Sequence, residues 1–315
     1  MIISASRRTD IPAFYSEWFM NRIRAGYCQV PNPLNTKQIA TVSLDPADVE
    51  AIVFWSKNPA PLIPYLDELD QRGFHYYFQF TLNNYPRAIE PNVPSFESRL
   101  KTFKKLSERV GVLRVVWRYD PIIISNMTDY DFHREKFSWI ADELRGATQR
   151  VMVSIVDFYK KTDNRLSKLE KEEGFLFERD VQYSSGVSDL LKDLHQIAMQ
   201  NSIEIFTCAE EVNFSSVGVP PGKCMDDGIL LLIQPNMIRY KKDPVQRDSC
   251  LCSVSKDIGL NNTCIHGCQY CYATINLEVA QRRHNEHDPD SPVLWGSPET
   301  VDEKADKSRS QLKLL

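Results

Sequence analysis

Hydrophobic and polar positions alternate through the first two-thirds of the chain in a pattern that predicts strands separated by helices. Six short apolar runs are typical of buried strands and span 2–4, 51–55, 74–82, 112–119, 150–156 and 203–208. Apolar residues at helical spacing predict helices over 61–71, 95–110, 128–145 and 187–200, and an earlier one that ends at Gly26. The pattern therefore predicts an α/β fold.

Strands that alternate with helices require a parallel sheet. Right-handed crossovers would curl six such strands into a partial or full (β/α) barrel of TIM type, and a flat doubly wound sheet is the alternative. No glycine-rich dinucleotide or phosphate loop follows the first strand, which disfavours Rossmann and P-loop proteins. We expect a six-stranded barrel over 1–211, a cysteine-rich iron–sulfur segment over 212–281 that caps the barrel mouth, and a polar tail over 282–315.

Composition and charge limit the possible cellular locations and binding partners of the protein. The chain has 315 residues and a formal net charge of −4, which gives no general electrostatic footprint for nucleic acid. The N-terminus lacks the apolar region of a secretory signal, and the longest apolar runs are too short to cross a bilayer. We therefore predict a cytoplasmic protein with no membrane partner. The sequence does not predict its oligomeric state.

Polar side chains follow every predicted strand at its carboxyl end, where the loops of a parallel barrel converge. For any single residue, contact with solvent is explanation enough, and Arg7 or Arg8 could simply pair with Asp10. As a set, these cations, amides and hydroxyls suit a ligand that bears carboxylate or phosphate groups. The candidate cofactor-binding residues are Arg7, Arg8, Lys57, Asn58, Gln79, Asn83, Arg118, Ser154, Glu210 and Tyr270. The candidate catalytic residues are Tyr119, Asp120 and Tyr159.

The strongest motif is Cys264-x3-Cys268-x2-Cys271, with the aromatic Tyr270 before the last cysteine. Three thiolates in one short loop are each able to bind one iron of a cubane 4Fe–4S cluster. The fourth iron then has no ligand from this loop and is open to the amino and carboxylate groups of S-adenosylmethionine. We interpret His266, inside the loop, as a residue that orients the loop or hydrogen-bonds a cluster sulfide.

This motif resembles the signature of the radical S-adenosylmethionine superfamily, and the run from Cys264 to Ala273 looks most like its spore photoproduct lyase and DNA-repair-photolyase-like branch. The whole chain also resembles an uncharacterised bacterial domain-of-unknown-function family, through SASRRTDIPAFY, VFWSKNPAP, WRYDP, TCAEE and the late cysteines. In the superfamily the motif follows the first strand, whereas here it follows the sixth. A clear Gly-Gly-Glu segment is also missing. We interpret the late position as a circular permutation or an independent placement of the loop.

Four further cysteines, Cys208, Cys224, Cys250 and Cys252, are enough to close a second cubane cluster or a tetrahedral zinc site. We predict that they hold an auxiliary 4Fe–4S cluster. The alternative is that Cys208 and Cys224 are buried, inert thiols. Cys28 is interpreted as structural.

These features predict an enzyme that cleaves S-adenosylmethionine reductively to a 5′-deoxyadenosyl radical. The resemblance implies a nucleotide or nucleic-acid substrate, and a peptide or small metabolite is equally consistent with the residues. Reduction of the cluster implies a flavodoxin- or ferredoxin-type partner. Two alternatives stay open: a cluster-bearing redox or sensor protein without S-adenosylmethionine, and a structural zinc protein whose ligands come from the late cysteines and His266.

Overall fold

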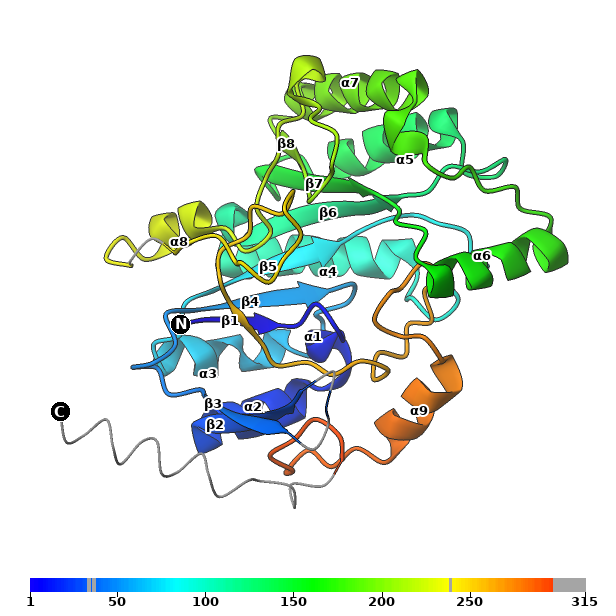
Figure 1. The fold of residues 1–315 in the computed structure, drawn as a ribbon. Helices are drawn as coiled ribbons and strands as arrows, with labels where there is room; N and C mark the ends of the chain where they lie inside the picture. The colour runs from blue at the N-terminus through cyan, green and yellow to red at the C-terminus, as the bar shows by residue number, and fades with distance from the viewer. Residues whose placement is uncertain (33–34, 36–37, 238–239, 297–315) are drawn as a thin grey trace.

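One large parallel sheet organises the computed structural model, which describes residues 1–32, 35, 38–237 and 240–296 (Figure 1). Its strand order is β8-β7-β6-β5-β4-β1-β9, and every neighbouring pair is parallel. The strands are β1 (Ile2–Ala5), β4 (Ala51–Ser56), β5 (Tyr76–Thr81), β6 (Val115–Ile122), β7 (Arg150–Ile155), β8 (Glu204–Thr207) and β9 (Lys256–Asp257). A separate antiparallel pair joins β2 (Tyr27–Pro31) to β3 (Ile39–Ser43).

The helices mostly connect consecutive strands, and several begin at side chains that cap them. Ser95 and Asp129 accept hydrogen bonds from the first-turn amides of α4 and α5, as expected for N-cap residues. The helices are α1 (Ile11–Phe14), α2 (Ser16–Ala25), α3 (Leu66–Gln71), α4 (Phe96–Val110), α5 (Tyr130–Glu143), α6 (Lys160–Glu173), α7 (Ser185–Gln200), α8 (Asp227–Ile233) and α9 (Leu277–Asn285). Short 3₁₀ turns lie at Ile63–Tyr65, Val112–Arg114, Val181–Tyr183 and Ser215–Val217.

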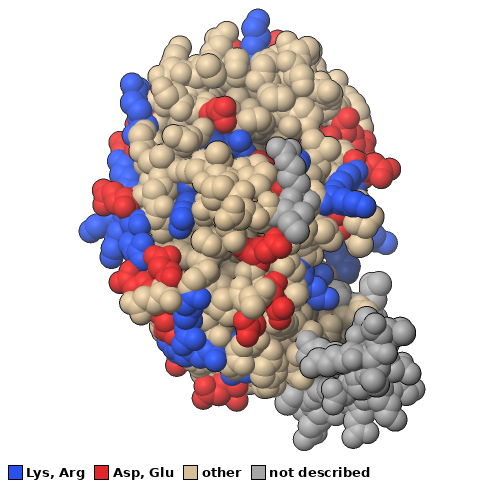
Figure 2. Space-filling model, turned by 90° about the vertical axis from the view of Figure 1, so that its left-hand side faces the viewer, with Lys and Arg blue, Asp and Glu red and all other residues tan. Residues whose placement is uncertain are grey.

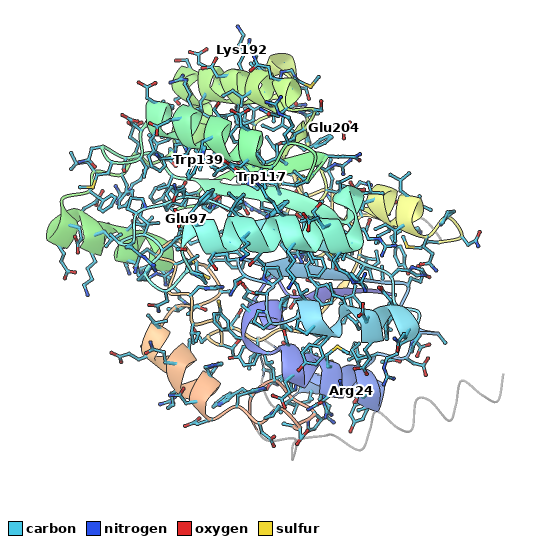
Figure 3. All side chains as sticks on the ribbon, turned by 180° about the vertical axis from the view of Figure 1, so that it is seen from behind. Arg24, Glu97, Trp117, Trp139, Lys192 and Glu204 are labelled. Atoms are coloured by element: carbon cyan, nitrogen blue, oxygen red, sulfur yellow. The ribbon has the colours of Figure 1, made fainter. Side chains whose placement is uncertain are left out.

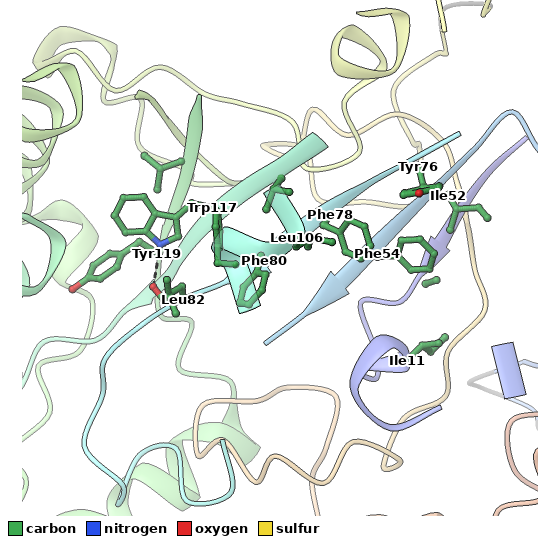
Figure 4. Packing of buried hydrophobic residues seen from close by; sticks show 14 of the residues in the cluster. Ile11, Ile52, Phe54, Tyr76, Phe78, Phe80, Leu82, Leu106, Trp117 and Tyr119 are labelled. Atoms are coloured by element: carbon green, nitrogen blue, oxygen red, sulfur yellow. Dashed lines mark hydrogen bonds between the residues drawn. The ribbon is translucent and has the colours of Figure 1, made fainter. Parts of the chain in front are cut away.

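Helices α2, α3, α4, α5 and α7 pack against the same face of the sheet, in front of it when the molecule is seen from behind (Figure 3). Alternate strand residues supply this core, including the aromatic row Phe54, Phe78 and Phe80 (Figure 4). The buried Trp117 indole donates a hydrogen bond to the Leu82 carbonyl at 3.0 Å. Sequential strand order with right-handed crossovers accounts for helices gathering on one face.

The opposite face of the sheet is covered by the C-terminal segment. Strand residues that point this way, among them Val53, Tyr77 and Val116, form a second buried cluster with α8 and with Cys250 and Cys252. This cover is the reason that both faces of the strands are apolar. It also places the late cysteines against the sheet.

The predicted parallel α/β fold is confirmed, but the sheet is not closed into a barrel. Among the described residues, β8 and β9 are its two edges, so the full barrel was wrong. Closure would require β8 to pair with the other edge, and β9, a strand of two residues from the C-terminal segment, occupies that side of β1 instead. The sequence pattern also missed the β2–β3 pair, α6, α8 and α9.

Part of the predicted polar tail lies in the described region and packs against the N-terminal helices. The Trp18 indole donates to the Ser291 carbonyl at 2.9 Å, and Arg22 donates to the Asp290 carbonyl at 2.8 Å. Val293 and Leu294 are buried. The remainder of that tail, 297–315, lies outside the described residues.

Within the described residues, we find no helix with the length and apolarity that crossing a bilayer demands.

Candidate functional site

A cavity of about 320 Å³ opens at the carboxyl ends of the parallel strands. Its walls come from the segments that follow β1, β4, β6, β7 and β8, together with the C-terminal segment over residues 246–273. Ligands of open parallel sheets bind in this position, because the loops there converge and are free to vary. The cavity is therefore the candidate functional site.

Seven of the eight cysteines line this cavity, and all eight are free thiols. Three of them, Cys264, Cys268 and Cys271, belong to the short motif. The other four are Cys208, Cys224, Cys250 and Cys252. The remaining cysteine, Cys28, is buried in the core between the sheet and the helices. Residues far apart in the sequence thus bring thiols of two groups to one space.

The motif loop is held in place chiefly through its backbone carbonyls, by Arg165 of α6. This guanidinium donates to the carbonyls of Gln269 at 2.9 Å and Thr274 at 3.0 Å, and also to those of Ile275 and Cys271. The Thr274 amide in turn donates to the Cys271 sulfur at 3.3 Å. One cation therefore fixes the shape of the loop that carries the three thiols.

The N-terminal part of the chain holds the other side of the same loop. Asp10 accepts from the His266 imidazole and from the Lys57 amide, both at 2.8 Å. Tyr15 donates to the Thr263 carbonyl at 2.6 Å, and Asn92 donates to the Ile265 carbonyl at 3.0 Å. His266 therefore orients the loop from a buried position, while its Nδ1 atom has no hydrogen-bond partner among the described residues.

Gly267 is a position in the loop where the backbone itself requires glycine. Its φ is +72°, and an added Cβ would lie 3.2 Å from atoms of Asn92, Leu277 and Pro91. The loop passes so closely over these residues that a larger residue would strain it.

A buried ion pair fixes the aromatic residue of the motif. Glu90 is 3% exposed, and it accepts from the Tyr270 hydroxyl at 2.5 Å and from the Lys57 ammonium at 2.8 Å. Burial opposes ionisation of Glu90, but the neighbouring Lys57 and Arg99 cations outweigh it and lower its pKa. The Lys57 ammonium also lies 5.5 Å from the centre of the Tyr270 ring. Lys57 and Tyr270 are therefore held rigidly at the cavity wall.

The second group of thiols is assembled from three separate segments. The sulfurs of Cys208 and Cys224 are 2.7 Å apart. The Cys252 sulfur accepts hydrogen bonds from the Cys224 amide at 3.3 Å and the Met225 amide at 3.4 Å. Cys250 lies beside Cys252 and is buried with it. We call these four residues the sheet-side thiols, because they cover the face of the sheet opposite the helices.

Arg118 of β6 joins the sheet-side thiols to the carboxylates of the cavity. Its guanidinium donates to the Cys224 sulfur at 2.7 Å and forms an ion pair with Asp120 at 2.5 Å. Asp120 also accepts a short hydrogen bond from the Ser154 hydroxyl. The Trp55 ring lies against both Arg118 and Arg7, at 4.9 and 5.7 Å from its centre.

Burial and neighbouring groups shift several proton affinities around the cavity. Burial raises the pKa of Cys264 well above that of a free thiol and raises the pKa of Cys268 to about 12. Hydrogen bonds from neighbouring thiols lower the pKa of Cys252 and of Cys208. Burial raises the pKa of Glu210 to about 8, although its carboxylate accepts the Ile155 amide at 3.0 Å. Burial also raises the pKa of Cys224, and the hydrogen bond to Cys252 raises the pKa of Cys250, so thiols of raised and of lowered pKa lie side by side in this cavity.

The structure gathers most of the predicted site residues at the cavity. The seven cysteines there are joined by Arg7, Arg8, Lys57, Arg118, Asp120, Ser154, Tyr159, Glu210 and Tyr270. The remaining predicted residues, Asn58, Gln79, Asn83 and Tyr119, are absent from the described lining.

Strand alternation explains the position of Tyr119. Arg118 and Asp120 point toward the cavity, so Tyr119 between them points toward the helices. It is 2% exposed, and its hydroxyl lies 2.8 Å from His133. Gln79 and Asn83 act nearby as supports: Gln79 donates to the Cys224 carbonyl at 2.8 Å, and Asn83 binds the backbone of Asp120.

Sequence reasoning missed several residues that shape the site. Asp257 of β9 accepts from the hydroxyls of Ser4 and Ser6, at 2.8 and 2.7 Å, and from the Arg7 amide at 2.8 Å. Gly259 allows this approach, because a Cβ there would lie 1.9 Å from the Ser6 hydroxyl. Arg165 was missed because its helix is highly charged and its apolar stripe is narrow. No local pattern marks either residue.

Within the part of the chain that the structure describes, no three His, Cys, Asp or Glu side chains are arranged around a point that would hold one metal ion. An iron–sulfur cubane has a different requirement, because each thiolate binds its own iron. The soft thiolate donors, the free state of all three motif cysteines and the amide directed at the Cys271 sulfur fit such a cluster.

The fold and the site define a parallel α/β protein with a thiol-lined cavity at the carboxyl edge of its sheet. The chain belongs to the family described as Domain of unknown function (DUF1848), whose model matches residues 2–273. No curated protein and no solved structure matches the chain.

Proposed function

We propose that this protein is an iron–sulfur enzyme of the radical S-adenosylmethionine type. The observation that carries the proposal is the placement of Cys264, Cys268 and Cys271 at the cavity where the polar ends of the strands converge. The sequential strand order, with the crossover helices on one face, supports a partial (β/α) barrel with this cavity as its mouth.

A reduced 4Fe–4S cluster on the motif loop would supply one electron that splits S-adenosylmethionine into methionine and a 5′-deoxyadenosyl radical, which then takes a hydrogen atom from the substrate. Cys264, Cys268 and Cys271 would hold this cluster. Arg165 and Asp10 would keep the loop in a fixed orientation through the contacts described above. Tyr270, held by Glu90, would offer a rigid aromatic surface beside it.

The polar residues of the cavity favour an anionic substrate of small or nucleotide-like size. Arg7, Arg8 and Arg247 reach the cavity, and guanidinium groups bind carboxylate and phosphate in a bidentate manner. A cavity of about 320 Å³ suits a small molecule or one nucleotide. On the face shown in Figure 2, basic and acidic side chains are interspersed, so that face presents no continuous basic surface for a nucleic-acid strand.

The reaction requires an electron donor, so we propose a flavodoxin- or ferredoxin-type reductant and a cytoplasmic location, where thiols stay reduced. Tyr159 and Glu210 line the cavity and are candidates for contact with the substrate. Asp120, paired with Arg118, would position that cation.

The test is anaerobic purification followed by reduction with dithionite in the presence of S-adenosylmethionine. We expect a brown protein whose loop cluster yields 5′-deoxyadenosine and methionine in equal amounts. Colourless protein that contains only zinc would support the structural zinc alternative. An intact, reduced cluster that yields no 5′-deoxyadenosine would support the redox or sensor alternative and would exclude the proposal.

A further inference from the structure

The sheet-side thiols of Cys208, Cys224, Cys250 and Cys252 form a group that the motif cluster does not need. They reach the cavity from three segments: Cys208 follows β8, Cys224 precedes α8, and Cys250 and Cys252 precede β9. We propose that these four thiolates hold a second metal centre, separate from the one on the motif loop and facing it across the same cavity.

The backbone positions of the four cysteines are fixed by contacts with the sheet and with one another. The Cys208 amide donates to the Val153 carbonyl at 2.9 Å, which continues the β7–β8 ladder. The Cys224 carbonyl accepts from the Tyr77 hydroxyl at 2.5 Å and from Gln79 at 2.8 Å. The Ser253 amide donates to the Met225 carbonyl at 3.0 Å, which ties the third segment to the second. Such a preformed donor set is what a metal centre requires.

The groups around the sulfurs are those that stabilise thiolates. Two backbone amides point at the Cys252 sulfur, and the Arg118 guanidinium points at the Cys224 sulfur from 2.7 Å. Arg118 is only 5% exposed, so its charge acts at low dielectric. A core of inert thiols gains nothing from a buried cation and directed N–H donors, whereas the anionic ligands of a metal do.

Within the described residues no three His, Cys, Asp or Glu side chains surround a point that would hold one metal ion, so a single zinc ion does not fit here. Four thiolates would instead bind the four irons of a cubane cluster and leave no open position for a substrate. The centre is therefore distinct in kind from the loop centre, which has three protein ligands. Its place on the cavity wall puts it beside the substrate, while Arg118 and Trp55 lie along the same wall.

The decisive variant is the triple substitution Cys264→Ala, Cys268→Ala and Cys271→Ala, which removes the loop centre and leaves the sheet-side thiols intact. After anaerobic purification, iron, acid-labile sulfide and zinc are counted per chain. We expect about four iron and four sulfide to remain, as full occupancy of one cluster would give, whereas zinc alone would contradict the inference. Wild-type protein should carry the loop centre in addition.

A matched variant, Cys208→Ser with Cys250→Ser, should lose the second centre while the loop cluster and its response to S-adenosylmethionine persist. Circular dichroism of both variants checks that they fold. The paramagnetic resonance signal of the second cluster in the triple variant should not change when S-adenosylmethionine is added, because that cluster has no open iron.

A folded triple variant that holds no iron–sulfur cluster would overturn the inference, and so would a Cys208–Cys224 disulfide found by mass spectrometry in native protein. These results leave the proposed function standing if wild-type protein still cleaves S-adenosylmethionine. Conversely, a metal-loaded triple variant beside a wild type without such cleavage would reject the proposed function and keep the second centre.

Discussion

The two groups of thiols differ in how the chain brings them together. The motif cysteines lie within eight residues of one another, and their loop is stabilised from outside by Arg165, Asp10 and Asn92. The sheet-side thiols come from segments up to 44 residues apart, since 252 − 208 = 44, and each is fixed to the sheet or to its neighbours. A local motif is visible in the sequence, whereas an assembled one becomes visible only in the fold.

The largest expected effect follows from removing one motif thiol. Cys268→Ala leaves two ligands on the loop, so we expect loss of the loop cluster and a fall in 5′-deoxyadenosine formation to background, at least about 10³-fold. Iron content and product yield under dithionite check this. Cys28→Ala is the control, because that thiol lies in the helix-side core and should leave both quantities unchanged. Equal losses in the two variants would mean that the effect is general unfolding.

Acidification should affect both groups together, because it acts on the scaffold they share. Burial lowers the pKa of His133 from its ordinary 6.5 to about 4. The unfolded chain therefore binds this proton first as the pH falls, so the stabilisation is complete above pH 6.5 and is lost towards pH 4. A shift of this size corresponds to about 3 kcal/mol.

Urea unfolding of wild-type protein and His133→Gln at pH 7 and pH 4 measures this loss. The wild type should lose about 3 kcal/mol more of its free energy of unfolding than the variant does. If the free energy of unfolding fell equally between pH 7 and pH 4 in the wild type and in His133→Gln, protonation of His133 would not be the cause of the acid destabilisation.

A third change separates the two groups of thiols. Arg165→Ala removes the donor for four loop carbonyls, and we expect it to destabilise the motif loop by about 2 kcal/mol and to speed loss of the loop cluster. The sheet-side thiols make no contact with Arg165 that the structure describes, so metal held there should be unaffected. Iron release to a chelator follows the loss over time.

Arg179→Ala is the matched control, because it removes a cation of the same region that pairs with Asp163 and Glu170 instead of the loop. If the Arg179→Ala and Arg165→Ala variants released iron equally fast, the hydrogen bonds from Arg165 to the loop carbonyls would not be what retains the cluster.

The smallest expected effect concerns Gly267. Gly267→Ala would place a side chain at φ +72° against Asn92 and Pro91, and we expect a cost of about 1 kcal/mol that is confined to the loop. Thermal unfolding of the whole chain should shift little, while iron release from the loop becomes faster. Unchanged release would show that the loop accommodates the extra methyl group.

Much of the fold could be predicted because its strands are long enough to show a period. The six apolar runs correspond to β1, β4, β5, β6, β7 and β8, and the helices α4, α5 and α7 show clear apolar stripes. The β9 strand has two residues, too few for any periodicity, and it joins the sheet only because Asp257 binds the segment after β1. The sequence pattern therefore could not predict that β9 forms one edge of the sheet.

The candidate site shows the same limit at the level of single residues. Arg118 and Asp120 could be placed at the mouth because they follow a strand, but Tyr119 required knowing which face of β6 points inward. The anchors Arg165 and Glu90 act through tertiary contacts with a loop that is about 100 or more residues away, and their own surroundings in the sequence are ordinary.

The pairing of β9 with β1 has a consequence for biosynthesis. The second residue of the chain begins a strand whose outer neighbour is made more than 250 residues later. Until β9 has been synthesised, the outer edge of β1 has no strand to pair with, and neither group of thiols is complete. Metal loading must therefore wait until the segment over 250–271 has been made, by which time β1, β4, β5, β6, β7 and β8 of the sheet are already available.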